Sequence, residues 1–328
     1  MLKIGRISET VFKRSVIKRI KNRNKDIVLG VGIGRDFSLI KSDSSYIVNG
    51  SECIELNDEQ SLYLGLHKLA NKIYVSGAFL TNIVVDIILP EGFEENELRT
   101  IISEIDSIVE ELNISISGCN TRVSSAVVKP IISVYASGII KEDEPIYSDR
   151  AQAGDDIVVT KWIGLEGTSI IAKREEATLK NRFSTSFVDS AIDFDRYISI
   201  ATEARIAKEL KVHSMHNASE GGIFAGFWEI AGAANLGCTV DLLSIPLKQQ
   251  TVEICEEYGV NPYELLSGGS LIITTANGKD LVSALEDEGI SSVVVGKITE
   301  SNDRLVINGD EKRFLESPRG DEIYKIKK

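Results

Sequence analysis

A strand pattern followed closely by a helix pattern sets the fold class of this chain. Residues 81–90 (TNIVVDIILP) form an apolar run rich in β-branched residues that ends at a proline, which is typical of a strand. Residues 95–112 (ENELRTIISEIDSIVEEL) repeat apolar side chains at helical spacing, as on one face of an amphipathic helix. Each element has an apolar face to bury, so a helix lying against a sheet is the packing that they favour.

The rest of the first half continues this alternation. A helix is expected over roughly 58–76, where Asn57 can cap the first turn. Its apolar face is formed by Leu62, Leu66, Leu69 and Ile73. Further strand patterns lie at 26–31, 45–49, 114–117 and 130–140. This order predicts an α+β domain with a mixed sheet and its helices on one face.

A polar stretch at 141–156 (KEDEPIYSDRAQAGDD) divides the chain near its middle. Beyond it, strand patterns lie at 157–160, 238–243, 270–275, 291–298 and 304–309. Helix patterns lie between and beside them, at 173–182, 186–210, 221–236, 248–258 and 278–288. We therefore expect an α/β protein of two domains, residues 1–150 and 151–328, and a chain of 328 residues is long enough for both.

Charge and composition exclude several classes of partner. Hydrophobic residues make up 43% of the chain and the formal net charge is −12, so we expect a globular protein that does not bind nucleic acid. One basic segment, from Lys3 to Lys25, departs from this acidic balance. It is interpreted as a solvated helix face, with a docking surface for phosphates or a partner as the alternative.

Cysteine usage and hydropathy point to the cytoplasm. The four cysteines include no CxxC pair, which favours a reducing compartment over a disulfide framework or a zinc site. The first residues, MLKIGRISET, lack the apolar core of a signal peptide, and no apolar run approaches the length of a membrane span. We expect a cytoplasmic protein without a membrane partner.

Two adjacent glycines open one of the predicted helices. Residues 215–231 read MHNASEGGIFAGFWEIA, so that Gly221 and Gly222 lie where the helix begins. Glycines at a helix start let the backbone come close to a ligand, and the N–H groups there favour an anion. This segment is predicted to form one wall of a phosphate site.

Several motifs, taken in order, indicate a family. GDDIVVTKWIGLEGTSIIA (154–172), the 215–231 segment and LLSGGSLIITT (265–275) together resemble the AIR synthase-related superfamily, and the likeness is to its HypE-like branch. GIGRDF (32–37) and GCNTR (118–122) extend the resemblance into the first half. The resemblance implies a two-domain fold, a homodimer formed through the N-terminal sheets, and binding of ATP with magnesium. It also implies that ATP activates or phosphorylates an oxygen of a small substrate.

The resemblance also implies site residues, which fall into three sets. Asp36 and Glu52 match positions that hold the metal. Asp36, Asn71, Lys72 and Asn120 match nucleotide-side positions of the first domain. In the second domain the corresponding wall consists of Gly164, Glu166, Gly167, Thr168, Asn217, Gly221 and Gly222.

This chain departs from the family pattern in one direction. Relatives carry acids or a histidine where it has Lys72, Asn120, Arg122 and Asn217. The predicted metal pocket therefore loses negative charge, and a charged lysine has no lone pair for Mg²⁺. We expect Lys72 to neutralise a phosphate, to pair with Asp36 or to face solvent.

Two other functions remain open at this point. The first is an active ATP-dependent enzyme in which Asp36 and Glu52 hold one cation. The second is a catalytically silent family member that acts as a dimeric binding or scaffold partner. Nucleotide binding with weak magnesium dependence is the prediction that the residues favour.

Overall fold

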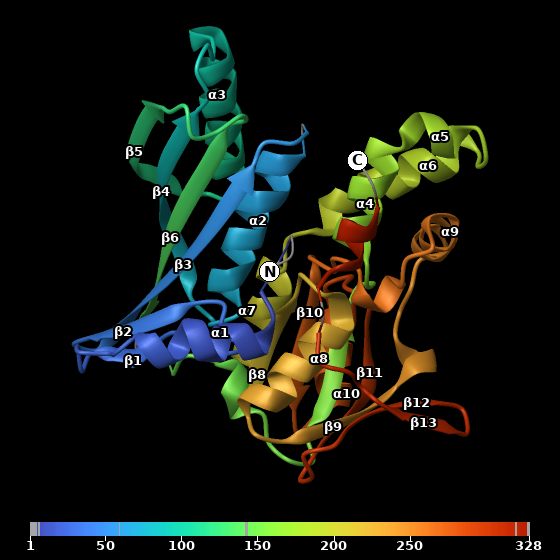
Figure 1. Ribbon diagram of the computed structural model, residues 1–328. Helices are drawn as coiled ribbons and strands as arrows, with labels where there is room; N and C mark the ends of the chain where they lie inside the picture. The colour runs from blue at the N-terminus through green and yellow to red at the C-terminus, as the bar shows by residue number, and fades with distance from the viewer. Residues whose placement is uncertain (1–4, 6, 59, 142–143, 319, 327–328) are drawn as a thin grey trace. The chain divides into compact units, whose positions relative to one another are not determined.

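A computed structural model describes residues 5, 7–58, 60–141, 144–318 and 320–326 of the chain. The chain forms two compact units, each with its own sheet (Figure 1). The first consists of residues 1–21, 31–35 and 146–328, and the second of residues 22–30 and 36–145. The division predicted at residue 150 is close to the change at 145–146, while two short N-terminal segments belong with the C-terminal part. We call these the C-terminal unit and the N-terminal unit.

The N-terminal unit is a six-stranded mixed sheet with two helices. Its strands are β1 (Ile27–Leu29), β2 (Ser38–Ser42), β3 (Ser45–Glu55), β4 (Phe79–Leu89), β5 (Ser115–Val123) and β6 (Ile131–Lys141). They lie in the order β1-β2-β3-β6-β4-β5, and every pair is antiparallel except β4 and β5. The mixed sheet predicted from the first half is therefore confirmed.

Both helices of this unit pack on one face of its sheet. Helix α2 (Ser61–Tyr74) lies against β3, β4 and β6, and α3 (Glu95–Glu111) packs beside α2 and against β5. Strand β6 alternates buried and less buried residues along its length, as expected for a strand covered on one side. Among the described residues of this unit, no helix covers the other face of the sheet (Figure 1).

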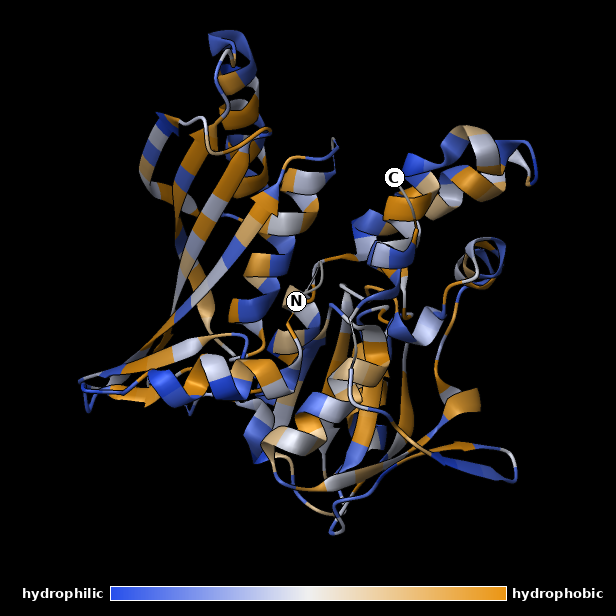
Figure 2. Ribbon diagram, in the orientation of Figure 1, coloured by the Kyte–Doolittle hydropathy of each residue, from blue (hydrophilic) through white to orange (hydrophobic). Residues whose placement is uncertain are grey.

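The C-terminal unit is built on a seven-stranded mixed sheet. Its strands are β7 (Asp156–Thr160), β8 (Ser214–Ala218), β9 (Gly237–Asp241), β10 (Ser270–Thr275), β11 (Ser292–Thr299), β12 (Arg304–Asn308) and β13 (Glu311–Phe314). Their order is β13-β12-β9-β11-β7-β10-β8, and β9 and β12 are the parallel pair. Strand β13 is exposed along its whole length, and Figure 2 shows the β12–β13 hairpin as largely hydrophilic at its tip.

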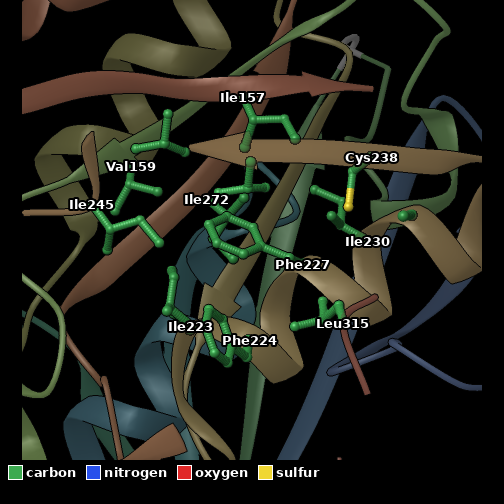
Figure 3. Close-up of a cluster of buried hydrophobic side chains, with 14 of the residues drawn as sticks. Ile157, Val159, Ile223, Phe224, Phe227, Ile230, Cys238, Ile245, Ile272 and Leu315 are labelled. Atoms are coloured by element: carbon green, nitrogen blue, oxygen red, sulfur yellow. The ribbon is translucent and has the colours of Figure 1, made fainter. Parts of the chain in front are cut away.

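Eight α-helices accompany this sheet among the described residues. They are α1 (Glu9–Ser15), α4 (Leu165–Arg174), α5 (Glu176–Lys180), α6 (Thr185–Ile192), α7 (Ala201–Glu209), α8 (Gly222–Ala233), α9 (Gln249–Tyr258) and α10 (Gly278–Asp287). The main core lies between α8 and the sheet, where Phe227 is fully buried among Ile157 and Ile272 (Figure 3). A second core joins α4, α6 and α9 through Ile171, Val188 and Ile254.

The predicted helices and strands of highest periodicity are confirmed, and the structure corrects others. The helix expected over 186–210 is broken by a 3-10 turn at Asp193–Tyr197 into α6 and α7. The helix expected over 173–182 begins earlier and is interrupted, because residues 165–174 form α4 and a second helix, α5, follows it. Gly167 lies inside α4, and glycine is needed there because a Cβ would stand 2.4 Å from the Leu265 side chain. The glycine at 167 is therefore required by helix packing, although in the sequence a glycine at such a position resembles a turn signal.

The basic N-terminal segment is exposed where it is described. Helix α1 and the 3-10 turn Ile17–Arg19 contain no buried residue, and Lys13 and Arg19 face solvent. These exposures agree with a solvated helix face; Lys3 and Arg6 of the same segment lie outside the described residues. None of the helices within the described ranges has both the length and the apolar composition needed to cross a bilayer.

Candidate functional site

The two glycines that open α8 have left-handed backbone conformations. Gly221 has φ 86° and Gly222 has φ 67°, in the region that L side chains rarely adopt. A Cβ on Gly222 would lie 2.5 Å from the carbonyl oxygen of Tyr263. Close packing of two backbone segments therefore requires glycine at this position, independently of any ligand bound at the start of the helix.

A carboxylate of the chain itself occupies the N–H groups at the start of α8. The N–H of Gly221 donates to Asp321 Oδ2 at 2.6 Å, and the N–H groups of Leu266 and Ile323 donate to Asp321 Oδ1 at 3.3 and 2.9 Å. Asp321 is only 4% exposed. The anion that the sequence predicted at Gly221 is thus supplied by the C-terminal segment, which the glycine pattern alone did not indicate.

Burial and a neighbouring acid act together on Asp321. Burial, with a smaller contribution from the charge of Glu166, raises the pKa of Asp321 to about 7, although the three N–H donors favour the ionised form. A carboxyl group with this pKa changes its charge in the neutral pH range. Asp321 is therefore a titratable group built into the base of α8.

The residues of α4 that were predicted to line the site support the loop at 265–268. The N–H of Gly164 donates to Ser267 Oγ at 2.9 Å, and the N–H of Gly167 donates to the Leu266 carbonyl at 3.0 Å. Glu166 accepts a hydrogen bond from the Gly268 N–H at 3.2 Å. Thr168 donates to Thr251 Oγ1 at 3.0 Å and is fully buried. The structure thus gathers the predicted α4 residues beside the glycine start of α8, as buried supports of its neighbouring loop.

The strand before α8 carries two buried polar side chains. His216 is hydrogen-bonded through Nε2 to Glu229 Oε2 at 3.1 Å and through Nδ1 to Ser148 Oγ at 3.2 Å. Asn217 is 2% exposed, and its Oδ1 has no hydrogen-bond partner among the described residues. An unpaired buried amide oxygen costs about 1–3 kcal/mol, so Asn217 is a position at which a ligand donor would be favourable.

A cavity of about 180 Å³ lies within the C-terminal unit beside the start of α8. It is lined by residues from the segments 7–12, 32–35 and 220–229, together with Pro318 and Gly320. Trp228 donates its indole N–H to Glu9 at 3.0 Å, and the Arg304 guanidinium lies 4.1 Å from the centre of the Trp228 ring. No local sequence pattern indicates this cavity, because its walls come from four distant segments. Gly32 of GIGRDF lines the cavity, and a Cβ on the nearby Gly34 would lie 3.1 Å from the carbonyl oxygen of Glu229, another lining residue.

In the N-terminal unit, Glu52 is held by two lysines of α2. Lys72 Nζ lies 2.6 Å from Glu52 Oε2 and also donates to the Ser51 carbonyl at 2.9 Å. Lys68 Nζ lies 3.5 Å from Glu52 Oε1. Burial raises the pKa of Glu52, and the two lysines lower it by more, so that it lies below its ordinary value. Of the three roles expected for Lys72, the structure shows an ion pair, with Glu52 in place of Asp36.

The other first-domain residues are not all gathered at this cluster. Asn71 is fully buried in α2, next to Lys72. Asp36 precedes β2, whose first residue, Ser38, pairs with Asn49 of β3, so Asp36 and Glu52 lie toward the same end of this strand pair. Asp36 is partly buried.

Asn120 lies on the opposite face of the sheet from Glu52. Its register partner is Asp86, which in turn pairs with Ser133, whereas Glu52 pairs with the fully buried Val134 beneath the helices. Neighbouring residues of a strand point to opposite faces, so Asn120 and Asp86 lie on the face away from α2. Arg122 pairs with Asp86 at 3.2 Å on that face. Within this unit, Asn120 and Lys72 therefore lie on opposite faces of the sheet.

A divalent cation does not fit the residues that were expected to hold it. No group of three or more His, Cys, Asp or Glu side chains within the described ranges is arranged to bind a metal ion. Both carboxylate oxygens of Glu52 already face an ammonium group. Two unit charges 4 Å apart repel by about 4 kcal/mol near a protein surface, and a divalent ion doubles this figure. A magnesium ion at Glu52 would therefore have to displace Lys72 first.

Most of the C-terminal unit matches a known protein family. Residues 152–308 match the model of the AIR synthase related protein, C-terminal domain. This part of the chain is an AIR synthase-related C-terminal domain. The family resemblance expected from the motifs of the second half is thereby confirmed.

Curated proteins similar to this chain align over parts of both units. It is 25% identical over 269 residues to a protein of Methanocaldococcus jannaschii assigned to hydrogenase expression and formation, covering 80% of this chain and 78% of the relative. It is also 25% identical over 249 residues to the carbamoyl dehydratase HypE of Rhizobium leguminosarum bv. viciae, covering 74% and 69%.

Solved structures share the fold along nearly the whole chain. The structure of a HypE–HypF complex aligns with a TM-score of 0.76 at 15% identity, covering 94% of this chain and 99% of the other. A HypE structure in complex with ATP aligns with a TM-score of 0.69 at 18% identity, covering 96% of each chain. A ThiL structure with AMPPCP and TMP gives 0.73 at 17% identity, again covering 96% of each chain. The two-domain α/β fold predicted from the sequence is therefore confirmed.

Proposed function

We propose that this AIR synthase-related chain binds an ATP-type nucleotide and uses it to activate an oxygen of a small substrate. The observation that carries the proposal is the shared fold, over 96% of each chain, with a HypE structure that contains ATP. The residues at 164–168 and 221–222, which the family resemblance associates with nucleotide, lie beside the 265–268 loop in the C-terminal unit and support the proposal.

The proposed chemistry is phosphoryl transfer to a carbonyl or amide oxygen. The γ-phosphoryl group of ATP forms a bond to the substrate oxygen, the bond to the β-phosphate breaks, and ADP leaves. The resulting phosphate ester is a far better leaving group than the free oxygen. Such catalysis requires positioning and charge stabilisation, so cationic side chains and backbone N–H groups are the relevant protein groups.

Calorimetric titration tests nucleotide binding directly. We expect the full chain to bind ADP or a non-hydrolysable ATP analogue saturably, at one site per chain. Turnover is tested separately by following ADP release while candidate small amides and carboxylates are added, with Asp36→Ala as the variant that distinguishes an active metal site. The absence of heat or saturation at millimolar nucleotide, with and without Mg²⁺, would refute the proposal.

A second candidate function is that of a homodimeric binding partner, and the N-terminal unit supplies an observation in its favour. The sheet face away from α2 and α3 carries exposed apolar side chains, among them Phe79 at 70% and Tyr135 at 52% exposure. Partners in register with them include Ile139 and Val84. We propose that this face forms the dimer contact that the family resemblance implies, in a cytoplasmic protein whose four cysteines are free thiols.

Sedimentation analysis of the full chain tests this second candidate. We expect a dimer whose dissociation constant rises at least tenfold in the variant Tyr135→Glu, because a charge would be buried in an apolar contact. Ser103→Glu, at an exposed position of α3 on the other side of the sheet, is the control. A monomeric wild-type chain at micromolar concentration would contradict the dimer.

A further inference from the structure

The cluster of Lys68, Lys72 and Glu52 is the feature that nucleotide binding as described above does not yet use. We propose that Lys68 and Lys72 take the place of a divalent cation at Glu52, so that the chain binds nucleotide phosphates without magnesium. This inference rests on the proposed nucleotide binding, and it specifies which group of this unit carries the positive charge. All three side chains belong to the N-terminal unit.

The local fold directs both lysines at one carboxylate. Lys68 and Lys72 are four residues apart in α2, so they lie on the same face of the helix. Glu52 projects from β3 toward that face. Gly50 lets the helix come close, since a Cβ there would lie 3.3 Å from Ile73 and 3.7 Å from the Cβ of Lys72. The cluster is thus fixed by how α2 packs on β3.

The charges of the cluster do not cancel. One carboxylate faces two ammonium groups, so the three side chains carry a net charge of +1 when all are ionised. Glu52 is held ionised by its two partners, which keep its pKa below the ordinary value. The arrangement therefore presents a fixed positive charge to an anion.

Partial exposure separates this cluster from a buried structural ion pair. The side chains of Lys68 and Lys72 are each 19% exposed, and that of Glu52 is 15% exposed. An ammonium group has three donors, and Lys72 uses two of them on Glu52 and the Ser51 carbonyl. Its third donor is available to a phosphate oxygen, which an ammonium group binds as a point charge.

The experiment compares nucleotide binding with and without magnesium. The full chain is titrated with ADP at fixed ionic strength, once in EDTA and once in about 5 mM Mg²⁺. This Mg²⁺ concentration is well above a typical Mg–nucleotide dissociation constant. We expect dissociation constants that agree within about threefold, because the cation is built into the chain. A tenfold or greater gain on adding Mg²⁺ would overturn the inference and leave nucleotide binding intact.

Two variants of Lys72 keep the inference falsifiable. Lys72→Gln removes the charge, and we expect it to weaken ADP binding in EDTA by roughly 10- to 100-fold, the range for a hydrogen bond to a charged group. Lys72→Glu places a second carboxylate beside Glu52, and we expect its ADP binding to become dependent on Mg²⁺. Lys41→Gln, an exposed charge on β2, is the matched control and is expected to bind like the wild type. Equal ADP binding by Lys72→Gln and wild type would overturn the inference.

A titration with Mn²⁺ alone separates the cluster from the nucleotide. Electron paramagnetic resonance of free Mn²⁺ is followed as the wild-type chain is added. We expect no stoichiometric binding at about 1 mM, because the described residues form no site of three or more protein ligands. Tight Mn²⁺ binding that is lost in Glu52→Gln would contradict the inference even if no nucleotide bound. Failure to bind ADP under any condition would instead refute the proposed function.

Discussion

In each unit, side chains of the protein itself occupy the groups that were expected to bind a charged ligand, and these side chains have opposite charges in the two units. In the C-terminal unit, N–H groups typical of an anion site bind the Asp321 carboxylate, which is 4% exposed. In the N-terminal unit, a carboxylate expected to bind a cation meets Lys68 and Lys72, each 19% exposed. Burial distinguishes the two cases. The first is closed and contributes to folding, whereas the second remains open to an anion.

Gly222→Ala is the strongest test of the closed character of the first region. The Cβ would lie 2.5 Å from the Tyr263 carbonyl oxygen, and φ is 67°, so both a backbone clash and conformational strain oppose the change. We expect a loss of about 3–5 kcal/mol in the free energy of unfolding, measured by urea denaturation.

A glycine in open space provides the control for that substitution. Gly289 has φ 76° with nothing within 4 Å of its Cβ position, so Gly289→Ala should cost only the strain of about 1–2 kcal/mol. Similar losses in the two variants would show that the start of α8 can move away from the 262–266 segment.

Asp321 links the stability of the first region to pH. Its folded pKa, about 7, lies above its ordinary value of 3.8, so the folded state binds more protons than the unfolded state between these values. The contribution of Asp321 is fully present below about pH 4 and is lost as the pH rises through 7. Three pKa units correspond to about 4 kcal/mol.

The variant Asp321→Asn isolates this effect because its amide does not titrate. We expect its free energy of unfolding, relative to the wild type, to increase between pH 4 and pH 7 and to level off above, as followed by urea denaturation at each pH. A relative stability that is flat, or that falls with pH, would show that the three N–H donors keep the carboxylate ionised in the folded state.

Glu52→Gln tests the second region, where we expect a smaller effect. The pKa of Glu52 lies below its ordinary value, so its stabilising contribution is present above the unfolded pKa of 4.5 and is lost as the pH falls through the folded pKa. The variant should lose about 1 kcal/mol near pH 7 and much less near pH 3. Glu95→Gln, which breaks the exposed pair with Arg99, is the matched control and should cost about 0.3–0.5 kcal/mol at most. Equal losses for Glu52 and Glu95 at pH 7 would remove the distinction between a clustered pair and a surface pair.

Elements with a strong period were predictable from the sequence. Helices α2 and α3 and strand β4 follow directly from their apolar spacing, and the structure places them within a few residues of the expected bounds. Strand β8 was missed because its sequence, SMHNA, has three polar side chains and no β-branched residue, whereas the equally buried β10, SLIITT, is rich in them. Helix α4 was missed because the glycines at 164 and 167 serve close packing.

The candidate site was only partly predictable, because contacts between distant segments do not show in a local sequence pattern. The motifs placed the residues at 164–168 and 221–222, which the structure brings around the 265–268 loop. No local pattern could show that Asp321, a hundred residues beyond Gly221, would take the N–H group at the start of α8. The face on which Asn120 lies also depends on strand register, which a single motif does not determine.

A crystal structure of the full chain with a non-hydrolysable ATP analogue and Mn²⁺ tests the central claim most directly, because Mn²⁺ is located by its anomalous scattering. We predict nucleotide phosphates in contact with Lys72 Nζ, the Lys72–Glu52 ion pair retained, and no Mn²⁺ peak within about 2.5 Å of Glu52. A Mn²⁺ ion bound by Asp36 and Glu52, with Lys72 turned away from the carboxylate, would contradict it.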